Sequence, residues 1–322
     1  MTTCSIVIPV YGRAALTQQC LDMLLASTPE RAELEIVVVD DGSTDGTPTM
    51  LESYGDRIRI VRHARNKGFG VACNDGAAAA SGEWLVLLNN DTQPQPGWLD
   101  ALLAYAADRE RVGVVGAKLL FENDTVQHAG VVFTRDRHAR HVYSGFPAAH
   151  PAVNRSRRFQ AVTGACALIK RQLFDEAGRF DTAFVNGYED LDLCLRLCSL
   201  GYENHYCHES VLYHLESATR DYALDPRNFR LFVDRWADRI EPDDLECYLE
   251  DGLIEISYWE RFPALLRVSP QLAVLTRERR TATEKLFAET SHDLFEARKE
   301  ILRLNLQLLD RSSNGERTTR KA

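Results

Sequence analysis

The sequence lacks several features that would place it in common protein classes. Its 322 residues carry 38 Lys and Arg against 47 Asp and Glu, a formal net charge of −9, so the positive excess that favours nucleic-acid binding is missing. No apolar run approaches the roughly 18 residues of a membrane-spanning helix. No charged and then apolar leader precedes the first apolar segment, which predicts that there is no signal peptide. We therefore expect a cytoplasmic protein that binds no nucleic acid.

Two motifs are also missing. The eight cysteines form no CxxC pair, and in a chain of this length such spacing is typical of free thiols in a reducing cytosol. The first apolar run is not followed by GxGxxG, the Gly-rich turn that a nicotinamide dehydrogenase would carry there.

What the sequence does contain is an alternation of strands and helices. The apolar runs are rich in Val and Ile, which is typical of strands covered on both faces; we expect them at residues 4–10, 34–40, 57–63, 83–88 and 112–120. Helical periodicity separates several of them, with helices expected up to residue 27, over 66–80 and over 96–107. This order predicts an α/β fold with a mostly parallel sheet, in which ligands bind beyond the carboxyl ends of the strands.

The pattern changes in the second half of the chain. Residues 117–160 lack helical periodicity and indicate a loop or hairpin excursion. The segment FQAVTGACALIKR, residues 159–171, reads as an apolar strand with a glycine inside it. Helices at 171–177 and 190–199 and a strand at 210–214 follow, and beyond about residue 220 the composition becomes helical and charged.

Two of the strand ends carry residues suited to a nucleotide. The segment IPVYGR, residues 8–13, exposes Tyr11, which can stack on a base or cap the sheet edge. The segment VVVDDGSTDGT, residues 37–47, ends its strand on Asp40 and Asp41, whose carboxylates can accept hydrogen bonds from a ribose or a base. Capping of the next helix explains the hydroxyl residues of this turn but not two consecutive aspartates.

Two further turns suit a phosphate and a metal ion. RNKGFG, residues 65–70, places basic residues beside glycines at a helix start, where backbone N–H groups favour a phosphate. LLNNDT, residues 87–92, ends a strand on two amides and Asp91, a hard oxygen ligand suited to Mg²⁺ or Mn²⁺. An Asx-type turn before proline is the alternative for that segment.

Two late segments add a carboxylate pair and a histidine. NGYEDLDLCLRLCSLGY, residues 186–202, puts Glu189 and Asp190 in the first turn of a helix, where the macrodipole favours negative charge. A carboxylate there that faces a cleft can instead act as general base on an acceptor hydroxyl. In VLYHLESATR, His214 ends a strand, where it can complete a metal or phosphate site or be structural.

The order and spacing of these six segments resemble the family 2 glycosyltransferases with the GT-A fold. The likeness spans about residues 4–220, and DDGSTDGT, LLNNDT and the ED helix are its most specific parts. The particular form resembles bacterial enzymes that build O-antigen, capsule or other cell-surface polysaccharides, including rhamnosyltransferases. The resemblance implies an α/β fold like that of nucleotide-diphosphate-sugar transferases, with a mostly parallel sheet flanked by helices and a helical C-terminal extension.

The same resemblance suggests domain limits. We expect a catalytic domain over 1–220, with its nucleotide-binding half at about 1–116 and its acceptor-side half at about 117–220. A helical extension over 221–310 and a polar, disordered tail over 311–322 would follow.

The resemblance also implies a role for each matching residue. Residues from four strand-end turns would bind the donor nucleotide and sugar: Pro9, Tyr11, Arg13, Asp40, Asp41, Asn66, Lys67, Gly68 and Asn90. Asp91 and His214 would hold a divalent metal ion, Mn²⁺ or Mg²⁺. Asp190 would be the general base, and Glu189 would orient the acceptor or the donor sugar.

The family's pattern is broken at Asn89 and Asn90, where many relatives carry aspartates. Amides lower the negative charge of the site and are weaker metal ligands than carboxylates. Asp91 is therefore expected to supply the single carboxylate of a metal site.

The implied reaction is an inverting transfer of a sugar from a nucleotide-diphosphate donor, UDP- or dTDP-linked, to a hydroxyl of a glycan, lipid-linked or protein acceptor. Two alternatives belong to other classes. A non-catalytic nucleotide- or glycan-binding module could keep the fold. A sugar nucleotidyltransferase shares a related sheet but has a Gly-rich loop after its first strand, which IPVYGR lacks.

The last hundred residues permit several interpretations. Phe229, Phe232, Val233 and Trp236 predict a helix that packs back on the catalytic domain. A heptad pattern from Phe287 to Leu308 fits either a coiled-coil homodimer or one helix packed on its own chain. The segment SYWERFPALLRVSPQLAVL mixes aromatics, Arg and leucines as a peripheral contact with the inner face of the cell membrane would.

Overall fold

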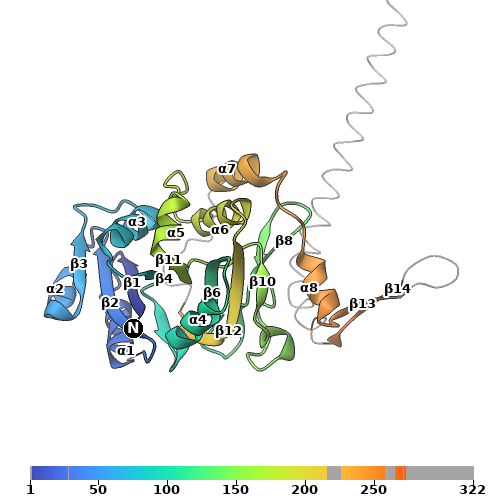
Figure 1. The fold of residues 1–322 in the computed structure, drawn as a ribbon, viewed down its shortest axis with the longest axis horizontal. Helices are drawn as coiled ribbons and strands as arrows, with labels where there is room; N and C mark the ends of the chain where they lie inside the picture. The colour runs from blue at the N-terminus through green and yellow to red at the C-terminus, as the bar shows by residue number, and fades with distance from the viewer. Residues whose placement is uncertain (1, 28, 216–225, 258–264, 271, 273–322) are drawn as a thin grey trace, which may run out of the picture. The chain divides into compact units, whose positions relative to one another are not determined.

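The apolar runs of the sequence form one large sheet with the strand order β10-β12-β6-β11-β4-β1-β2-β3 (Figure 1). The computed structural model of the chain describes residues 2–27, 29–215, 226–257, 265–270 and 272. The strands of that order are β1 Thr2–Val10, β2 Ala32–Asp40, β3 Arg59–Arg62, β4 Trp84–Leu88, β6 Val112–Leu120, β10 Arg157–Phe159, β11 Cys166–Lys170 and β12 Glu203–His214. Two short strands pair outside it, β5 (Thr92–Pro94) with β12 and β7 (Val126–His128) with β6.

The strand directions bring the polar strand ends to one edge. β1 is parallel to β2 and β4, β2 is parallel to β3, and β6 is parallel to β12. β11 is antiparallel to both β4 and β6, so β4 and β6 point the same way. The carboxyl-terminal residues Val10, Asp40, Leu88 and His214 therefore lie along the same edge of the sheet. The predicted α/β architecture with a mostly parallel sheet is confirmed.

Helices cover both faces of the sheet, as Figure 1 shows. Successive strand residues point to opposite faces, so Ile6 and Ile8 share a buried cluster with α1 (Ala14–Ala26) and α4 (Trp98–Ala107). Val7 belongs instead to the cluster on the other face, with residues of four further helices: α3 (Phe69–Ala79), α5 (Arg171–Glu176), α6 (Glu189–Ser199) and α7 (Pro226–Trp236). The remaining helical segments of the first unit are α2 (Thr47–Glu52), η1 (Gly55–Arg57), η2 (Pro151–Val153) and α8 (Asp244–Glu250).

The expected hairpin excursion is present, but the apolar segment after it is not one strand. β8 (Val131–Phe133) and β9 (Ala139–His141) form an antiparallel hairpin. The strand predicted at 159–171 is broken, because β10 ends at Phe159 and β11 begins at Cys166. The turn between them carries Gly164, where an added Cβ would lie 3.1 Å from the Cβ of Asp190. The glycine therefore serves a close approach of this turn to α6.

Two element boundaries also differ from the prediction. The helix expected from residue 66 begins at Phe69, because Gly68 adopts φ +93° and cannot continue a helix. The strand expected at 210–214 begins at Glu203 and shifts register between Cys207 and Val211, which hides its length in the sequence pattern.

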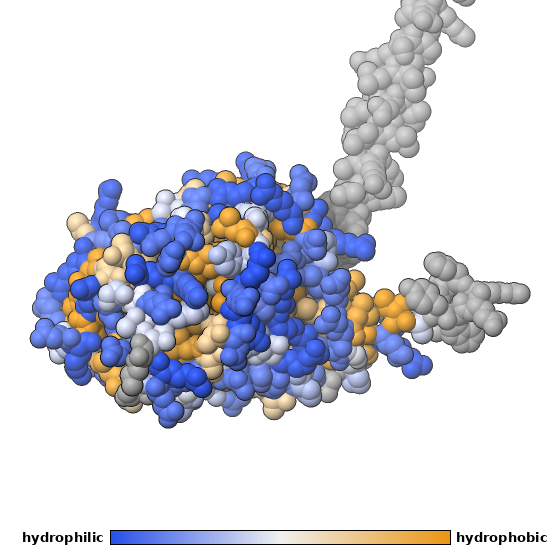
Figure 2. All heavy atoms as spheres, in the orientation of Figure 1, coloured by the Kyte–Doolittle hydropathy of each residue, from blue (hydrophilic) through white to orange (hydrophobic). Residues whose placement is uncertain are grey.

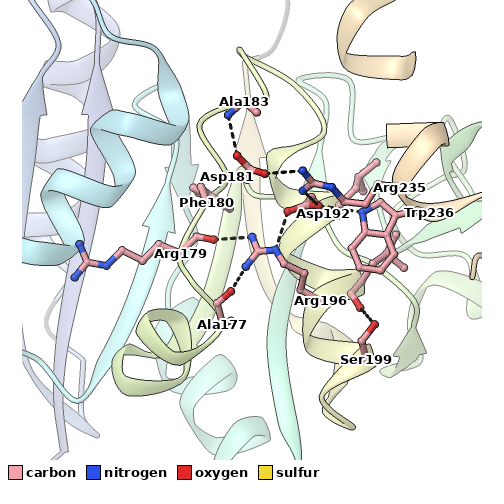
Figure 3. Close-up of polar contacts among 12 residues, drawn as sticks. Ala177, Arg179, Phe180, Asp181, Ala183, Asp192, Arg196, Ser199, Arg235 and Trp236 are labelled. Atoms are coloured by element: carbon pink, nitrogen blue, oxygen red, sulfur yellow. Dashed lines mark hydrogen bonds and ion pairs between the residues drawn. The ribbon is translucent and has the colours of Figure 1, made fainter. Parts of the chain in front are cut away.

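The helix predicted from Phe229, Phe232, Val233 and Trp236 is α7, and it packs back on the sheet as expected. Phe232 and Trp236 are buried in the cluster that also contains α6. A network of ion pairs and hydrogen bonds around Asp192 fastens the two helices together (Figure 3). Asp192 is fully buried, and its carboxylate accepts hydrogen bonds from Arg196 Nε (2.7 Å), Arg235 Nη1 (2.7 Å) and Trp236 Nε1 (3.0 Å). Asp192 therefore anchors α7 on α6.

Replacing Asp192 with asparagine is expected to lower the free energy of unfolding by about 3 kcal/mol, because Arg196 and Arg235 would lose a buried counter-charge. Denaturant unfolding followed by circular dichroism measures this. Asp181→Asn is the matched control: Asp181 pairs with the same Arg235 at 2.8 Å, but its side chain is 32% exposed, and about 1 kcal/mol or less is expected. Equal losses in the two variants would contradict the anchoring role of Asp192.

The eight cysteines are all unpaired thiols, in agreement with the expectation from their spacing. Burial raises the pKa of both Cys4 and Cys20 to about 12, so these thiols stay protonated at neutral pH. They act as apolar packing residues on one face of the sheet.

Residues 252–322 form a second unit, separate from the unit of residues 1–251. Its described part contains a hairpin of β13 (Ile254–Ser257) and β14 (Leu265–Val268), where the composition had predicted helices. The alternation of Ile254 and Ile256 with polar residues suits a strand. The heptad segment, the predicted tail and most of the proposed membrane-contact segment lie outside the described residues, as does the predicted domain boundary near 220.

Hydrophilic residues predominate on the face seen in Figure 2, with apolar residues gathered in separate patches. Among the described residues, no helix has both the length and the apolar character required to cross a membrane.

Candidate active site

Two adjoining hollows open at the carboxyl edge of the sheet. The larger has an empty volume of about 1140 Å³ and is lined by Pro9, Val10, Tyr11, Arg13, Asp41, Asn66, Gly68, Phe69, Ala72, Asn89, Asn90, Asp91 and Asn186. The smaller, of about 530 Å³, is lined by Phe69, Asn89, Asp91, Leu119, Gln127, His141, Thr163, Gly164, Ala165, Glu189, Asp190 and His214. Phe69, Asn89 and Asp91 line both, so we call them the larger and smaller parts of one cleft.

Asp91 and His214 meet at the wall that the two parts of the cleft share. Asp91 precedes β5, and the pairing of β5 with β12 sets Thr92 opposite His214. Asp91 Oδ1 lies 3.1 Å from His214 Nε2, and the two residues are only 5% and 6% exposed. The sheet thus brings together the two residues predicted as metal ligands.

Gln127, from β7, fixes the orientation of the His214 ring. Its amide N–H donates to the backbone oxygen of His214 at 3.3 Å, so its Oε1 faces the ring and lies 2.6 Å from Nδ1. Nδ1 then carries the ring proton, and the Nε2 lone pair faces Asp91 and the Asn89 amide, 3.2 Å away. An imidazole nitrogen and a carboxylate oxygen at this separation are two electron-pair donors that a cation would bridge. These residues fit a divalent metal ion.

Glu189 and Asp190 begin α6 and line the smaller part of the cleft. Asp190 Oδ2 accepts a hydrogen bond from the Gly164 N–H at 2.8 Å, and its Oδ1 accepts one from the Leu191 N–H at 2.9 Å. Glu189 is 2% exposed and accepts a hydrogen bond from the Gly187 N–H at 2.5 Å. Asp190 is therefore held in a fixed orientation while its side chain remains partly accessible.

A buried histidine supports the turn that holds Asp190. His128 donates from Nδ1 to the Ala117 carbonyl at 3.0 Å, and its Nε2 accepts from the Gly130 and Thr163 N–H groups. Burial lowers the pKa of His128 to about 3, with the neighbouring His141 as a second cause. His128 is thus neutral at physiological pH and keeps Nε2 available to the turn that also supplies the Gly164 N–H.

The two consecutive aspartates occupy different positions. Asp40 is buried and accepts a hydrogen bond from the Ser43 N–H at 3.0 Å, while Asp41 lines the larger part of the cleft. Asp41 Oδ1 accepts from the Lys67 N–H and Oδ2 from the Gly68 N–H, both at 2.9 Å. Asp41 therefore holds the turn of residues 65–68 against the end of β2.

The other predicted donor-binding residues lie around the same part of the cleft. Pro9, Tyr11 and Arg13 line it, and Tyr11 is 56% exposed, which leaves its ring free to stack on a planar group. Asn90 lines it as well, with its amide N–H donating to Thr17 Oγ1 at 2.8 Å. Asn66 and Gly68 are lining residues too, whereas Lys67 extends its ammonium group to Asp75 at 3.2 Å.

Four residues of the site were missed in the sequence: His63, Gln127, Gly164 and Asn186. Asn186 Oδ1 accepts a hydrogen bond from the Phe69 N–H at 3.0 Å, which ties the loop before α6 to the start of α3. Gly164 had a usable signal, a glycine inside an apolar segment, which indicates a close backbone approach. His63 and Gln127 had none, because their partners are far away in the sequence.

Carboxylates and a histidine at the carboxyl edge of a mostly parallel α/β sheet are typical of the GT-A class of sugar transferases. The family model described as glycosyl transferase family 2 matches residues 5–178, more than half of the chain. The chain belongs to glycosyl transferase family 2, as its sequence motifs predict.

Curated relatives agree with this family. The chain is 37% identical over 225 residues to the O-antigen biosynthesis protein RfbC of Myxococcus xanthus, a match that covers 67% of this chain and 17% of that protein. It is 28% identical over 238 residues to the N-acetylglucosaminyl-diphospho-decaprenol L-rhamnosyltransferase of Mycobacterium tuberculosis, covering 66% of this chain and 78% of that protein. An uncharacterized protein of Sinorhizobium fredii, y4gI, is 32% identical over 249 residues, covering 72% of this chain and 27% of its own length. The chain thus spans only 27% and 17% of y4gI and RfbC.

Solved structures share the fold. GalNAc-T7, crystallised with UDP, GalNAc and Mn²⁺, superposes with a TM-score of 0.60 at 17% identity, covering 74% of this chain and 49% of that one. The mannosyltransferase PcManGT from Pyrobaculum calidifontis, in complex with GDP-Man and Mn²⁺, gives a TM-score of 0.56 at 21% identity, covering 78% and 69%. The predicted GT-A fold is confirmed.

Proposed function

We propose that the chain is an inverting, metal-dependent glycosyltransferase that moves a sugar from a nucleotide-diphosphate donor to a hydroxyl group. The observation that carries the proposal is the shared cleft. The Asp91–His214 pair and Asp190 line its smaller part, and that part is continuous with a larger one lined by Pro9, Tyr11 and other predicted donor-binding residues.

The donor is proposed to be a UDP- or dTDP-linked sugar. Of Asp40 and Asp41, Asp41 lines the larger part of the cleft, and its carboxylate already accepts three hydrogen bonds, from Lys67, Gly68 and His63. A carboxylate offers about four lone-pair sites, so about one remains. Uracil and thymine present a single ring N–H to such a site, whereas guanine presents two adjacent donors. The free capacity of Asp41 therefore favours a pyrimidine, with Tyr11 stacked on the base.

The metal ion would be held by Asp91 and His214, the two predicted ligands. The described part of the chain contains no group of three or more His, Cys, Asp or Glu arranged to hold a metal, so further oxygens would come from the donor diphosphate. When bound, Mn²⁺ or Mg²⁺ would neutralise negative charge on the leaving diphosphate. Asn89 and Asn90 keep the site's own negative charge low, which suits a metal bound together with its substrate.

The chemistry proposed for the protein's own groups is a single displacement. Asp190 accepts the proton of the acceptor hydroxyl as its oxygen attacks the anomeric carbon. The bond from that carbon to the diphosphate oxygen breaks, and the nucleoside diphosphate leaves with the electron pair. The Gly164 N–H fixes the Asp190 carboxylate for this role at 2.8 Å. Glu189, buried beside it, orients the sugar or acceptor.

The acceptor is proposed to be a glycan or lipid-linked glycan of a cell-surface polysaccharide. Support comes from the names of two relatives, one an O-antigen biosynthesis protein and one a rhamnosyltransferase acting on a diphospho-decaprenol-linked sugar. A cytoplasmic location with peripheral contact to the membrane, and a homodimer through the last helices, stay predictions. The non-catalytic alternative is disfavoured because Asp91, Asp190 and His214 line the same part of the cleft.

Calorimetric titration of the full chain with UDP, dTDP and GDP tests the donor and metal assignments together. In the presence of Mn²⁺ we expect UDP or dTDP to bind at least about tenfold more tightly than GDP. Asp41 has about one free lone-pair site, so the second donor of guanine would lack a partner, at a cost of about one hydrogen bond. EDTA is expected to weaken UDP or dTDP binding. Equal affinity for GDP would contradict the pyrimidine assignment, and binding unchanged by EDTA would contradict the metal site.

A further inference from the structure

His63 lies buried beneath the cleft and contacts two carboxylates at once. It directly follows β3, and its backbone N–H donates to the Asp40 carbonyl at 2.9 Å, so its place beside β2 is fixed. Its side chain is 4% exposed. Nδ1 lies 2.6 Å from Asp41 Oδ1, and Nε2 lies 2.8 Å from Asp75 Oδ2.

Each ring nitrogen of His63 faces a carboxylate oxygen, so the ring links two acidic side chains. Asp41 is buried, at 4% exposure, whereas the side chain of Asp75 is 43% exposed. His63 therefore ties the carboxylate at the end of β2 to a carboxylate of α3 and leaves Asp41 little freedom to turn.

Both partners of His63 hold the same residue, Lys67. Asp41 accepts the backbone N–H of Lys67 at 2.9 Å, and Asp75 accepts its ammonium group at 3.2 Å. Asp41 also accepts the Gly68 N–H, directly before α3. The two carboxylates, the imidazole ring and the ammonium group form a chain of contacts from the end of β2 to α3, which we call the His63 clip: Asp41, His63, Lys67 and Asp75.

Close backbone contact with Gly42 also fixes the turn of residues 65–68. Gly42 has φ +78°, and an added Cβ would lie 2.5 Å from the carbonyl carbon of Arg65 and 2.7 Å from the backbone nitrogen of Asn66. The turn of residues 65–68 thus rests directly on the backbone that follows Asp41. Since Asn66 and Gly68 line the larger part of the cleft, the clip determines the shape of the wall that a nucleotide would meet.

We propose that His63 is a positioning residue for donor binding. It fixes Asp41 and, through Asp41, the turn of residues 65–68 that forms part of the donor-binding wall. The inference rests on the proposed function, in that the ligand of this wall is a nucleoside diphosphate. His63 does not itself line the cleft; it acts by holding the Asp41 carboxylate in a fixed orientation. Loss of the clip therefore weakens binding of the donor, and the rate at saturating donor changes little.

The test compares three variants of the full chain. His63→Gln can keep at most one of the two carboxylate contacts, and it is expected to raise the Kd for UDP or dTDP and the KM for the donor about tenfold, with kcat within about threefold. Asp75→Asn leaves the Asp41 contact in place and is expected to raise the Kd about threefold. Arg62→Gln is the control: Arg62 adjoins His63, but its side chain is 45% exposed and pairs with Glu52, so no change is expected.

A spectroscopic readout separates positioning from folding. Nitrogen NMR of the histidine rings is expected to show both nitrogens of His63 in hydrogen bonds, with the Nε2 signal shifted in Asp75→Asn. Circular dichroism confirms that each variant is folded before its Kd is measured. An Nε2 signal that Asp75→Asn leaves unchanged, or an unchanged nucleotide Kd in folded His63→Gln, would overturn the inference. A wild-type chain that binds no nucleoside diphosphate would instead overturn the proposed function, and the ring spectrum would still report on the clip.

Discussion

Replacing Asp190 with asparagine is expected to lower kcat about 10³-fold while the donor KM stays within about threefold. A positioned general base contributes on the order of 10²–10⁴ to the rate, and an amide cannot take up the acceptor proton. Asparagine keeps the size of the side chain and one oxygen for the Gly164 N–H, so the turn between β10 and β11 keeps its place. Steady-state transfer assays with the donor identified by binding measure both constants.

The control for this variant is Asp175→Asn, which removes a carboxylate from α5 that only pairs with Arg179 on the surface. No change in kcat is expected there. An Asp190→Asn chain with full transfer activity would remove Asp190 as the base and leave Glu189, the other carboxylate of α6 that lines the cleft, as the candidate.

Asp91→Asn is expected to lower transfer at least about 10³-fold and to weaken Mn²⁺ binding in the presence of UDP or dTDP by more than about tenfold. The variant removes the carboxylate that lies 3.1 Å from His214 Nε2, so the imidazole alone would remain of the predicted ligand pair. The electron paramagnetic resonance signal of free Mn²⁺, titrated with the protein and the nucleotide, measures the affinity independently of turnover.

Asp108→Asn, at the exposed end of α4, is the matched control for Asp91→Asn and is expected to bind Mn²⁺ as the wild type does. The metal assignment is wrong if Asp91→Asn retains wild-type Mn²⁺ affinity. If only the rate falls and the affinity does not, Asp91 contacts the substrate and not the metal ion.

The sequence could predict those parts of the site whose signal lies within one short segment, at the end of a strand. Pro9 lies near the end of the Val- and Ile-rich β1, and Asp41 and Asp91 follow β2 and β4. Parallel strands carry their ends to one edge whatever the length of the loops between them. His214 was found the same way, although its strand is longer than predicted, because only the last residues of β12 alternate regularly. The family resemblance then supplied the roles that the residue types alone left open.

The contacts that a strand end makes could not be predicted in this way. Asp40 and Asp41 look equivalent in the sequence, but only Asp41 lines the cleft. In the sequence, Asp192 is one of several acidic residues in the first turn of a helix, with nothing to set it apart. In the structure it contacts Arg235 and Trp236 of a helix that comes much later in the chain. Such contacts depend on how elements far apart in the sequence pack together, and the hydrophobic periodicity of a short segment does not reveal them.

The irregular region between β6 and β11 shows the same limit. Gln127 and His128 lie in a stretch without periodicity, so neither could be assigned a partner before the path of the chain was known. In the fold, Gln127 orients His214, and His128 supports the turn beside Asp190. Both reach the site through short strands and turns whose positions are set by the strands they pair with.

The most direct test of the central claim is donor hydrolysis by the full chain, measured as release of nucleoside diphosphate from UDP-, dTDP- and GDP-linked sugars with Mn²⁺ and with EDTA. We predict release from a UDP- or dTDP-linked sugar that requires Mn²⁺ and is lost in Asp91→Asn. Release that EDTA leaves unchanged, or that Asp91→Asn retains in full, would contradict a metal-dependent sugar transferase built on the Asp91–His214 pair.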